Sequence, residues 1–192
     1  MEESKSVNRL TIFKYNAILS ILFFLSSTFY LGVKTTNYNF SDYTISSLAR
    51  FLDKENLLIF NSLFMIKSFL DLSFAYYVLK FYNLRLKTLP ALILLVAILS
   101  FGLLGFFPIN QFPLIHLIMF VITFFSWLSS QYSLAKLTND KNFIDFSKFL
   151  ILVESIIGNI FLFFNYFNAI SETVYCLLIF IWLTIFIGRY LK

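Results

Sequence analysis

The chain is poor in the residues that build most metal centres and catalytic sites. Its 192 residues include one cysteine, one histidine, three prolines and five glycines. The single cysteine, Cys176, excludes an intrachain disulfide and a cysteine-based metal site. The single histidine, His116, excludes haem held by two histidines and argues against metal-dependent intramembrane hydrolysis, because such sites draw on several histidine ligands. We therefore expect no metal and no cofactor.

Charge is also scarce. Charged residues make up 13% of the chain and hydrophobic residues 59%, whereas soluble domains carry about 25% charged residues. A water-soluble fold could not bury so much apolar surface. The net charge of +5 does not indicate a nucleic-acid partner, because the 15 Lys and Arg residues are scattered between apolar runs and form no basic stripe. Gly-rich phosphate loops, dinucleotide fingerprints and nucleic-acid-binding modules are absent from the sequence.

Long apolar runs dominate the sequence instead. Six of them are close to the length of about 20 residues that crosses a bilayer as a helix. They cover residues 15–33, 57–79, 89–107, 113–135, 149–167 and 172–189. The sequence therefore predicts an all-α fold, an integral membrane bundle of six transmembrane helices that forms one domain over residues 1–192.

The positive charges predict how the bundle is oriented, because Lys and Arg near the ends of spans tend to stay in the cytoplasm. Eleven of the 15 fall on the side of the two termini, three fall in the opposite loops, and Lys67 lies inside a span. We therefore expect both the N- and the C-terminus in the cytoplasm. The loops on the outer side are then residues 34–56, 108–112 and 168–173.

The first outer loop is the longest and contains an amphipathic pattern. Ile45, Leu48, Phe51 and Leu52 recur at helical spacing. This pattern predicts a short amphipathic helix on the outer surface. We expect the helix to cover the outer mouth of the bundle.

Ionisable residues inside the spans form the first candidate site. Asn61, Lys67 and Asp71 share one face of the second span, and Lys67 and Asp71, four residues apart, are placed to form an ion pair. Glu154 of the fifth span is predicted at a similar depth, which allows a cluster of Lys67, Asp71 and Glu154. Such a cluster fits a proton or ion relay. The interpretation that we favour is a structural ion pair that fixes the register of the helices.

The second candidate site lies at the outer mouth and consists of Asp42, Ser46, Pro108 and His116. His116 is placed near the outer end of the fourth span, level with the first outer loop. A catalytic trio of Ser46, His116 and Asp42 is one interpretation, but no nucleophile motif surrounds Ser46. We favour a hydrogen bond by which His116 holds the outer loop on the bundle.

Three short segments carry a family resemblance. They are TISSLA at residues 44–49, GFFP at residues 105–108, and His116. With them the chain resembles the uncharacterised prokaryotic six-span membrane proteins grouped as a domain of unknown function and related to the eukaryotic DRAM, Frag and Sfk proteins. The resemblance implies a small six-helix bundle without an established reaction, whose eukaryotic relatives are linked to lipid distribution, lipid-anchor maturation and autophagy. It transfers no catalytic residue, and Ala49 stands where the pattern has glycine.

These observations leave three functional hypotheses. The favoured one is a non-enzymatic multi-pass membrane protein, either a lipid-binding accessory factor or a subunit of a membrane assembly, with membrane lipids or other membrane protein subunits as partners. The alternative is a small proton-coupled transporter that uses Lys67, Asp71 and Glu154. Against it, the spans lack paired Pro or Gly breaks. An outer-face hydrolase using His116 is the third hypothesis.

Overall fold

A computed structural model describes residues 11–163 and 168–192 of the chain, without the side chains of residues 159–163. Every regular element in this part of the chain is helical. The long helices are α2 (Asn16–Lys34), α3 (Lys54–Phe81), α4 (Leu89–Phe106), α5 (Pro113–Leu137), α6 (Lys141–Phe163) and α7 (Ala169–Tyr190). Two short 3-10 helices are η1 (Thr11–Tyr15), which runs into α2, and η2 (Ser46–Arg50), in the first outer loop.

The helices have the length and the surface of a membrane bundle. Among the described residues, five helices are long and apolar enough to cross a membrane, namely η1 with α2, α3, α4, α5 and α7. Large apolar side chains such as Phe69, Leu114 and Phe149 point outward and are more than 60% exposed. This outward apolar surface is stable in lipid and not in water. The chain is therefore a multi-pass membrane protein, and the predicted all-α bundle is confirmed.

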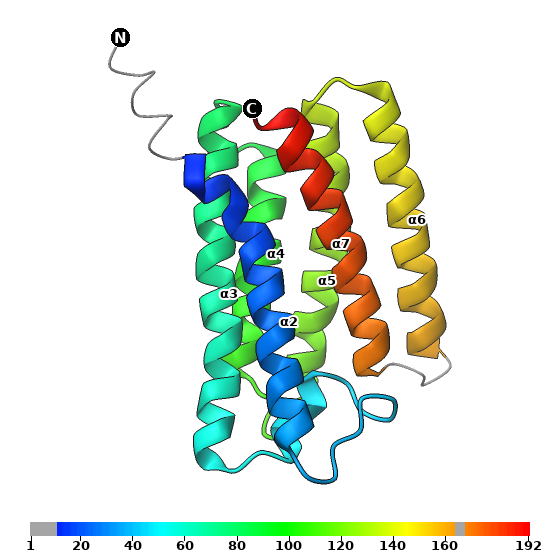
Figure 1. Cartoon of the computed structure of the whole chain (residues 1–192). Helices are drawn as coiled ribbons and strands as arrows, with labels where there is room; N and C mark the ends of the chain where they lie inside the picture. The colour runs from blue at the N-terminus through cyan, green and yellow to red at the C-terminus, as the bar shows by residue number, and fades with distance from the viewer. Residues whose placement is uncertain (1–10, 164–167) are drawn as a thin grey trace.

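The helices run alternately up and down and close into a ring (Figure 1). Each long helix packs against the next one in the chain, and α7 returns to pack against α2. Lys14 closes the ring at the end that holds the C-terminus, because its ammonium group donates a hydrogen bond to the carbonyl oxygen of Leu191 at 3.0 Å. The first outer loop lies at the opposite end, beside the start of α7 (Figure 1). The ring encloses an interior that every long helix reaches.

Local sequence explains where several helices begin and end. Asp53 precedes α3 and accepts a hydrogen bond from the backbone N–H of Asn56 at 2.8 Å, and Asn168 caps α7 through the N–H of Ser171 at 3.0 Å. These caps satisfy N–H groups that have no partner within the helix. Asn83 and Asn139 follow α3 and α5 with positive φ angles of 49° and 55°, which asparagine tolerates better than most residues.

Helix α6 begins earlier than the apolar run that predicts it. The run starts at residue 149, whereas the helix starts at Lys141 and is capped by Asp140, whose carboxylate accepts from the N–H of Asn142 at 2.9 Å. The extra two turns contain the exposed ion pair of Asp145 and Lys148. Hydropathy marks only the apolar part of a helix, and so it misses a polar first turn. The membrane depth inferred for Glu154 stays a prediction, because a polar first turn lengthens the helix without moving the apolar run.

The first outer loop contains a helix, but a shorter one than the amphipathic pattern suggests. Only η2 is helical, and its five residues form a 3-10 turn. Ile45 and Leu48 are buried, at 7% and 1% exposure, while Phe51 and Leu52 are half-buried. The apolar residues thus face the bundle as predicted. The helix stays short because Phe51 ends it, and Asp53 already begins α3.

Two glycines let α3 and α4 approach closely. A Cβ atom on Gly105 would lie 2.5 Å from the backbone oxygen of Asn61, and one on Gly102 would lie 2.8 Å from the side-chain oxygen of Ser68. Small residues at helix contacts are a common way to pack helices inside membranes. The contact places Asn61, a predicted site residue, at the α3–α4 interface, where its side chain is half-buried.

We expect Gly105→Ala to destabilise the protein by about 1–3 kcal/mol, because the clash is with backbone that cannot move aside. The matched control is Gly188→Ala in α7, where an added Cβ meets nothing within 4 Å. That change should be neutral or stabilise by up to about 1 kcal/mol. Thermal unfolding of both variants in one detergent provides the measurement, and equal melting temperatures would contradict the close approach.

Candidate functional site

A cavity of about 90 Å³ lies inside the ring of helices. All six long helices line it, and Ile45 and Ser46 of the first outer loop close it at one end. Most of the lining side chains are apolar, and many are aromatic. The polar ones are Ser46, Lys67, Asp71, Thr123, Ser171 and Glu172. The cavity is therefore an apolar space with a few charged groups at defined places on its wall.

Lys67 and Asp71 form a buried ion pair on this wall. The Lys67 ammonium nitrogen lies 2.5 Å from one carboxylate oxygen of Asp71, and their side chains are 6% and 1% exposed. Ser20 of α2 donates a hydrogen bond to the other carboxylate oxygen at 2.5 Å. The ammonium group also lies over the rings of Phe101 and Trp127, 4.5 and 5.7 Å from their centres. Each buried charge is thus compensated by groups of the protein.

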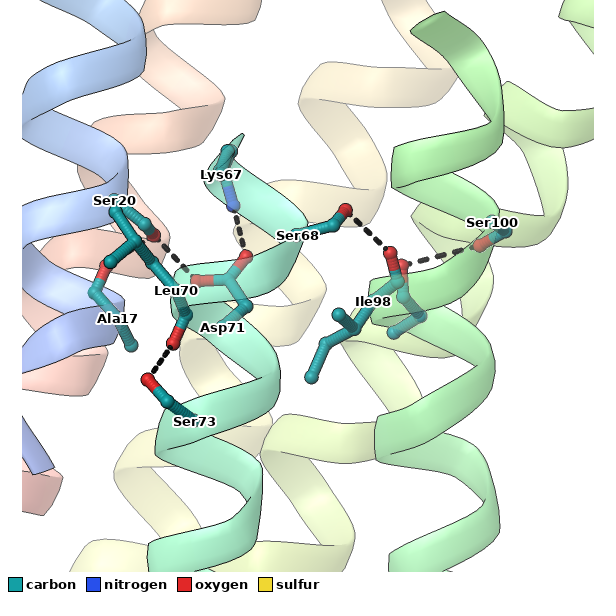
Figure 2. A network of polar contacts seen from close by, with 10 residues as sticks. Ala17, Ser20, Lys67, Ser68, Leu70, Asp71, Ser73, Ile98 and Ser100 are labelled. Carbon is teal, nitrogen blue, oxygen red and sulfur yellow. Dashed lines mark hydrogen bonds and ion pairs between the residues drawn. The ribbon is translucent and has the colours of Figure 1, made fainter. Parts of the chain in front are cut away.

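The ion pair belongs to a wider polar seam that joins neighbouring helices (Figure 2). Ser68, next to Lys67, donates a hydrogen bond to the carbonyl oxygen of Ile98 in α4 at 2.9 Å. Two residues after Asp71, Ser73 of α3 accepts a hydrogen bond from the Asn16 amide at 2.6 Å. Hydrogen bonds of this kind fix the rotation and height of one helix against the next. The seam therefore positions the ion pair at the cavity.

Glu172 of α7 holds the first outer loop over the cavity. Its carboxylate accepts a hydrogen bond from the backbone N–H of Ile45 at 2.5 Å. Two further bonds join the same loop to the start of α7: the N–H of Ala169 donates to the Tyr43 carbonyl oxygen at 2.7 Å, and the Asn168 amide donates to that of Ser41 at 2.8 Å. We call residues 41–50 the roof. The roof is fixed to α7 by backbone hydrogen bonds and not by apolar contacts alone.

Tyr38 supports the roof from the side. Its hydroxyl group donates a hydrogen bond to the Thr44 carbonyl oxygen at 3.1 Å, and its ring packs against those of Phe40, Tyr43 and Phe51. Burial, and secondarily the charge of Glu172, raise the pKa of Tyr38 above its ordinary value. Tyr38 therefore stays neutral at physiological pH and remains a hydrogen-bond donor.

Two aromatic side chains line the cavity beside α6. The ring of Phe124 stacks on that of Tyr175, with centres 5.0 Å apart. On its other side it lies so close to Gly158 that a Cβ there would be 2.5 Å from the ring. Glycine at position 158 thus lets the Phe124 ring withdraw toward α6 and leaves the cavity open.

Glu154 is buried in the same region, but it does not join the ion pair. Its side chain is fully buried, and the Nε2 atom of Gln131 lies 3.1 Å from both carboxyl oxygens. Among the described residues no ion pair includes Glu154. The predicted cluster is thus divided: Lys67 and Asp71 are in contact, Glu154 is bonded to Gln131, and Asn61 lies at the α3–α4 contact.

The predicted outer-mouth residues lie at one end of the bundle but are not brought together. The Nδ1 atom of buried His116 hydrogen-bonds the carbonyl oxygen of Phe107 at 2.7 Å, whereas Asp42 is exposed and accepts from the Asn39 amide at 2.8 Å. Pro108 is buried, and its carbonyl oxygen accepts from two backbone N–H groups of its own turn. Only Ser46 reaches the cavity.

These placements correct two expectations. His116 bonds the α4–α5 connection and not the first outer loop, since its side chain reaches back to the turn that precedes its own helix. Asn110 makes the contact that we expected of His116, because its amide donates to the Ala49 carbonyl oxygen at 3.3 Å. No hydrogen bond of the described residues joins Ser46 or Asp42 to His116, and so the geometry of a catalytic trio is not formed.

Sequence reasoning missed Glu172 and Gln131. Gln131 is a polar side chain within an apolar run, which is a signal that the sequence does contain. Glu172 stands at the edge of its predicted span, where a carboxylate at a helix start has an ordinary explanation in the helix dipole. Only the packing of the roof on α7 shows that it faces the cavity.

Comparison with known proteins supports a family but no function. The family model DUF998, described as a protein of unknown function, matches residues 18–188. No curated protein matches the chain, and no solved structure matches it either. The matched residues include all those that line the cavity.

Replacing one member of the ion pair should destabilise the fold. We expect Lys67→Met to lower the free energy of unfolding by about 3–5 kcal/mol, because Asp71 is left buried without its counter-charge. The double variant Lys67→Met with Asp71→Leu should recover most of this loss. Lys148→Met, which breaks an exposed pair, is the control and should change the stability little, because solvent screens that pair. Chemical unfolding in detergent measures all three, and similar losses in the two single variants would contradict the role of the pair.

Proposed function

The chain belongs to the DUF998 family of proteins of unknown function, and from the cavity we propose that it binds lipid, with one apolar chain held inside the ring of helices. The observation that carries this proposal is the apolar cavity, roofed at one end and lined by all six long helices. A ligand site is typically a concave, mostly apolar space with a few polar groups that fix orientation. A lipid is the apolar molecule that surrounds the protein at the highest concentration.

The size of the cavity limits what it holds. A water molecule needs roughly 10–15 Å³ of such space, so that 90 Å³ accommodates about six to nine groups of that size. This is a segment of one acyl chain and not a whole lipid. The head group and the rest of the lipid then lie outside the cavity. The fit favours a protein that engages single lipids at one chain.

The polar wall residues give the site a direction. Glu172, Ser46 and Ser171 lie at the roofed end, while Lys67 and Asp71 neutralise each other further inside. An apolar chain is favoured along the aromatic walls, and a polar group is favoured only near the roof. The roofed end is therefore the end of the cavity at which a polar group of the ligand is tolerated.

The site supports binding and not a reaction. The described residues bring together no nucleophile and base, and the histidine that would serve as base is bonded to a backbone carbonyl oxygen. We therefore propose a non-enzymatic lipid-binding accessory protein or subunit of a membrane assembly. The further relation to the DRAM, Frag and Sfk proteins, some of which are linked to lipid distribution, is part of this proposal; it rests on residues 44–49, 105–108 and His116.

Proton-coupled transport is the second candidate, favoured by the ion pair on the cavity wall. The transport hypothesis needs Lys67, Asp71 and Glu154 to exchange protons with one another. Glu154 is instead bonded to Gln131, while Ser20 and Lys67 both bind Asp71. The geometry thus supports lipid binding more strongly than a three-residue relay.

We expect a photoreactive fatty acid with a diazirine in its chain to label the cavity walls. Labelling in lipid vesicles, followed by mass spectrometry, should yield adducts on Phe124 or Tyr175 as well as on the outward-facing Phe69. Gly158→Ala should reduce the inner adducts several-fold, because the new Cβ pushes the Phe124 ring into the cavity. Gly188→Ala, with open space around the added group, should leave them unchanged.

The adduct on Phe69 controls for folding and for reagent delivery, since it reports the lipid-facing surface in every variant. Labelling of outward-facing residues alone in the wild-type protein would overturn the lipid-binding proposal. Equal inner labelling in wild type and Gly158→Ala would show that the ligand does not use this cavity.

We also propose that both termini face the cytoplasm, which the excess of Lys and Arg at that end supports. The sole cysteine makes the test simple. In a Cys176→Ser background, a membrane-impermeant maleimide added to intact cells should label Asn110→Cys, in the α4–α5 connection, and spare Lys192→Cys. In permeabilised cells, the maleimide should label both cysteines. Labelling of Lys192→Cys in intact cells would show that the C-terminus faces the outside.

A further inference from the structure

Glu154 is a buried carboxyl group that the proposed lipid site does not use. It has no measurable exposure, and it lies 13 residues into α6, which is roughly 20 Å along the helix axis. It therefore sits deep in the bundle. A carboxylate in such a place is costly unless a cation or a proton compensates its charge.

No cation within the described part of the chain compensates it. Among the described residues, the ion pairs join Lys67 to Asp71, Lys148 to Asp145 and Arg189 to Asp140. The residues without described side chains near α6, 159–167, include no Lys or Arg in the sequence. The only hydrogen-bond partner of Glu154 in the described structure is the neutral amide of Gln131.

The geometry also speaks against a bound metal ion. A cation needs several oxygen atoms directed at it, whereas the atom that faces both carboxyl oxygens is the Nε2 of Gln131, a donor. The other amide atom, Oε1, is buried without a partner. If the amide is rotated, so that Oε1 faces Glu154, a hydrogen bond forms only when the carboxyl group carries a proton. Both orientations are therefore compatible with a protonated acid.

The groups packed around Glu154 do not supply a charge of their own. From α7, Tyr175 and Cys176 lie close enough for electrostatic interaction with it, and both are neutral donors in this apolar setting. From α5, Gln131 faces it, and the Ser130 hydroxyl beside Gln131 is buried without a partner. The Tyr175 hydroxyl is likewise buried and unpartnered. The surroundings thus hold unused hydrogen-bonding capacity but no counter-ion.

A route for the proton lies one helical turn away. Ile157 and Gly158, three and four residues after Glu154, line the cavity, as does Tyr175. Residues at this spacing lie on the same face of a helix, about 5–6 Å apart. The cavity therefore reaches the part of α6 next to Glu154, where the Tyr175 hydroxyl supplies an exchangeable proton.

We propose that Glu154 is an intramembrane proton-binding site, kept as a neutral carboxylic acid by burial without a counter-ion, hydrogen-bonded to Gln131 and able to release its proton toward the cavity. The ligand is a proton and not a metal ion. The site is distinct from the Lys67–Asp71 ion pair, to which we assign a structural role. Proton binding at Glu154 does not depend on whether the cavity binds lipid.

Infrared spectroscopy of the purified protein in lipid tests this directly, because a protonated carboxylic acid has a carbonyl stretching band that a carboxylate lacks. At neutral pH we expect the wild-type protein to show this band and Glu154→Gln to lose the part of it that Glu154 contributes, any remainder coming from other buried carboxyl groups such as Glu172. Raising the pH should abolish the band in the wild type, and lowering it again should restore the band. Glu55→Gln, which changes an exposed carboxylate at the start of α3, should leave the band intact.

The difference spectrum between wild type and Glu154→Gln at neutral pH reports the Glu154 side chain. Carboxylate bands in this spectrum in place of the acid band would overturn the proposal. Should Glu154→Gln fail to fold, dicyclohexylcarbodiimide gives a second reading on the wild type, since it modifies protonated carboxyl groups in apolar surroundings. An adduct on Glu154 that decreases as the pH rises supports the site. The site is refuted if the wild-type protein shows no acid band at any pH at which it stays folded.

Discussion

The buried ion pair of Lys67 and Asp71 is the constraint to which the rest of the interior is fitted. Two charges inside a membrane bundle are tolerated only when each finds a partner, and here Ser20 and the rings of Phe101 and Trp127 complete the compensation. These partners come from α2, α4 and α5, so that satisfying one carboxylate and one ammonium group fixes three helices around α3. The pair thereby sets the register of four of the six long helices.

The cavity follows from how the ring closes. Helices that meet through glycines, such as α3 and α4, approach tightly, while the aromatic side chains of α5 and α7 hold their helices apart and leave space between them. Glu172 and the backbone of the roof then close one end. The result is an apolar interior with polar groups confined to a few positions, which is the arrangement that supports our proposal of lipid binding. Glu154 stands apart, because it faces an amide and not a charge.

Several features were predictable because they depend on spacing along one helix. Lys67 and Asp71 lie four residues apart, and any helix brings such residues onto the same face. The position of Glu154 was not predictable in the same way, because its partner is set by the rotation of α6 against α5 and by a helix start that hydropathy does not mark. The same holds for His116. Its place near the outer end of a span was inferred from the sequence, but its hydrogen bond to the Phe107 carbonyl oxygen depends on the conformation of the turn before α5.

The sequence by itself determined that the chain is an all-α membrane protein, because apolar runs of bilayer length have no other stable form. It also determined the pairing within α3. Only the tertiary structure decided that Glu172 holds the roof, that Gln131 faces Glu154 and that a cavity lies among the helices. The physical reason is that these features join side chains of different helices. Whether such side chains meet depends on the rotation and spacing of whole helices. Packing sets these, and the local pattern of residues does not show them.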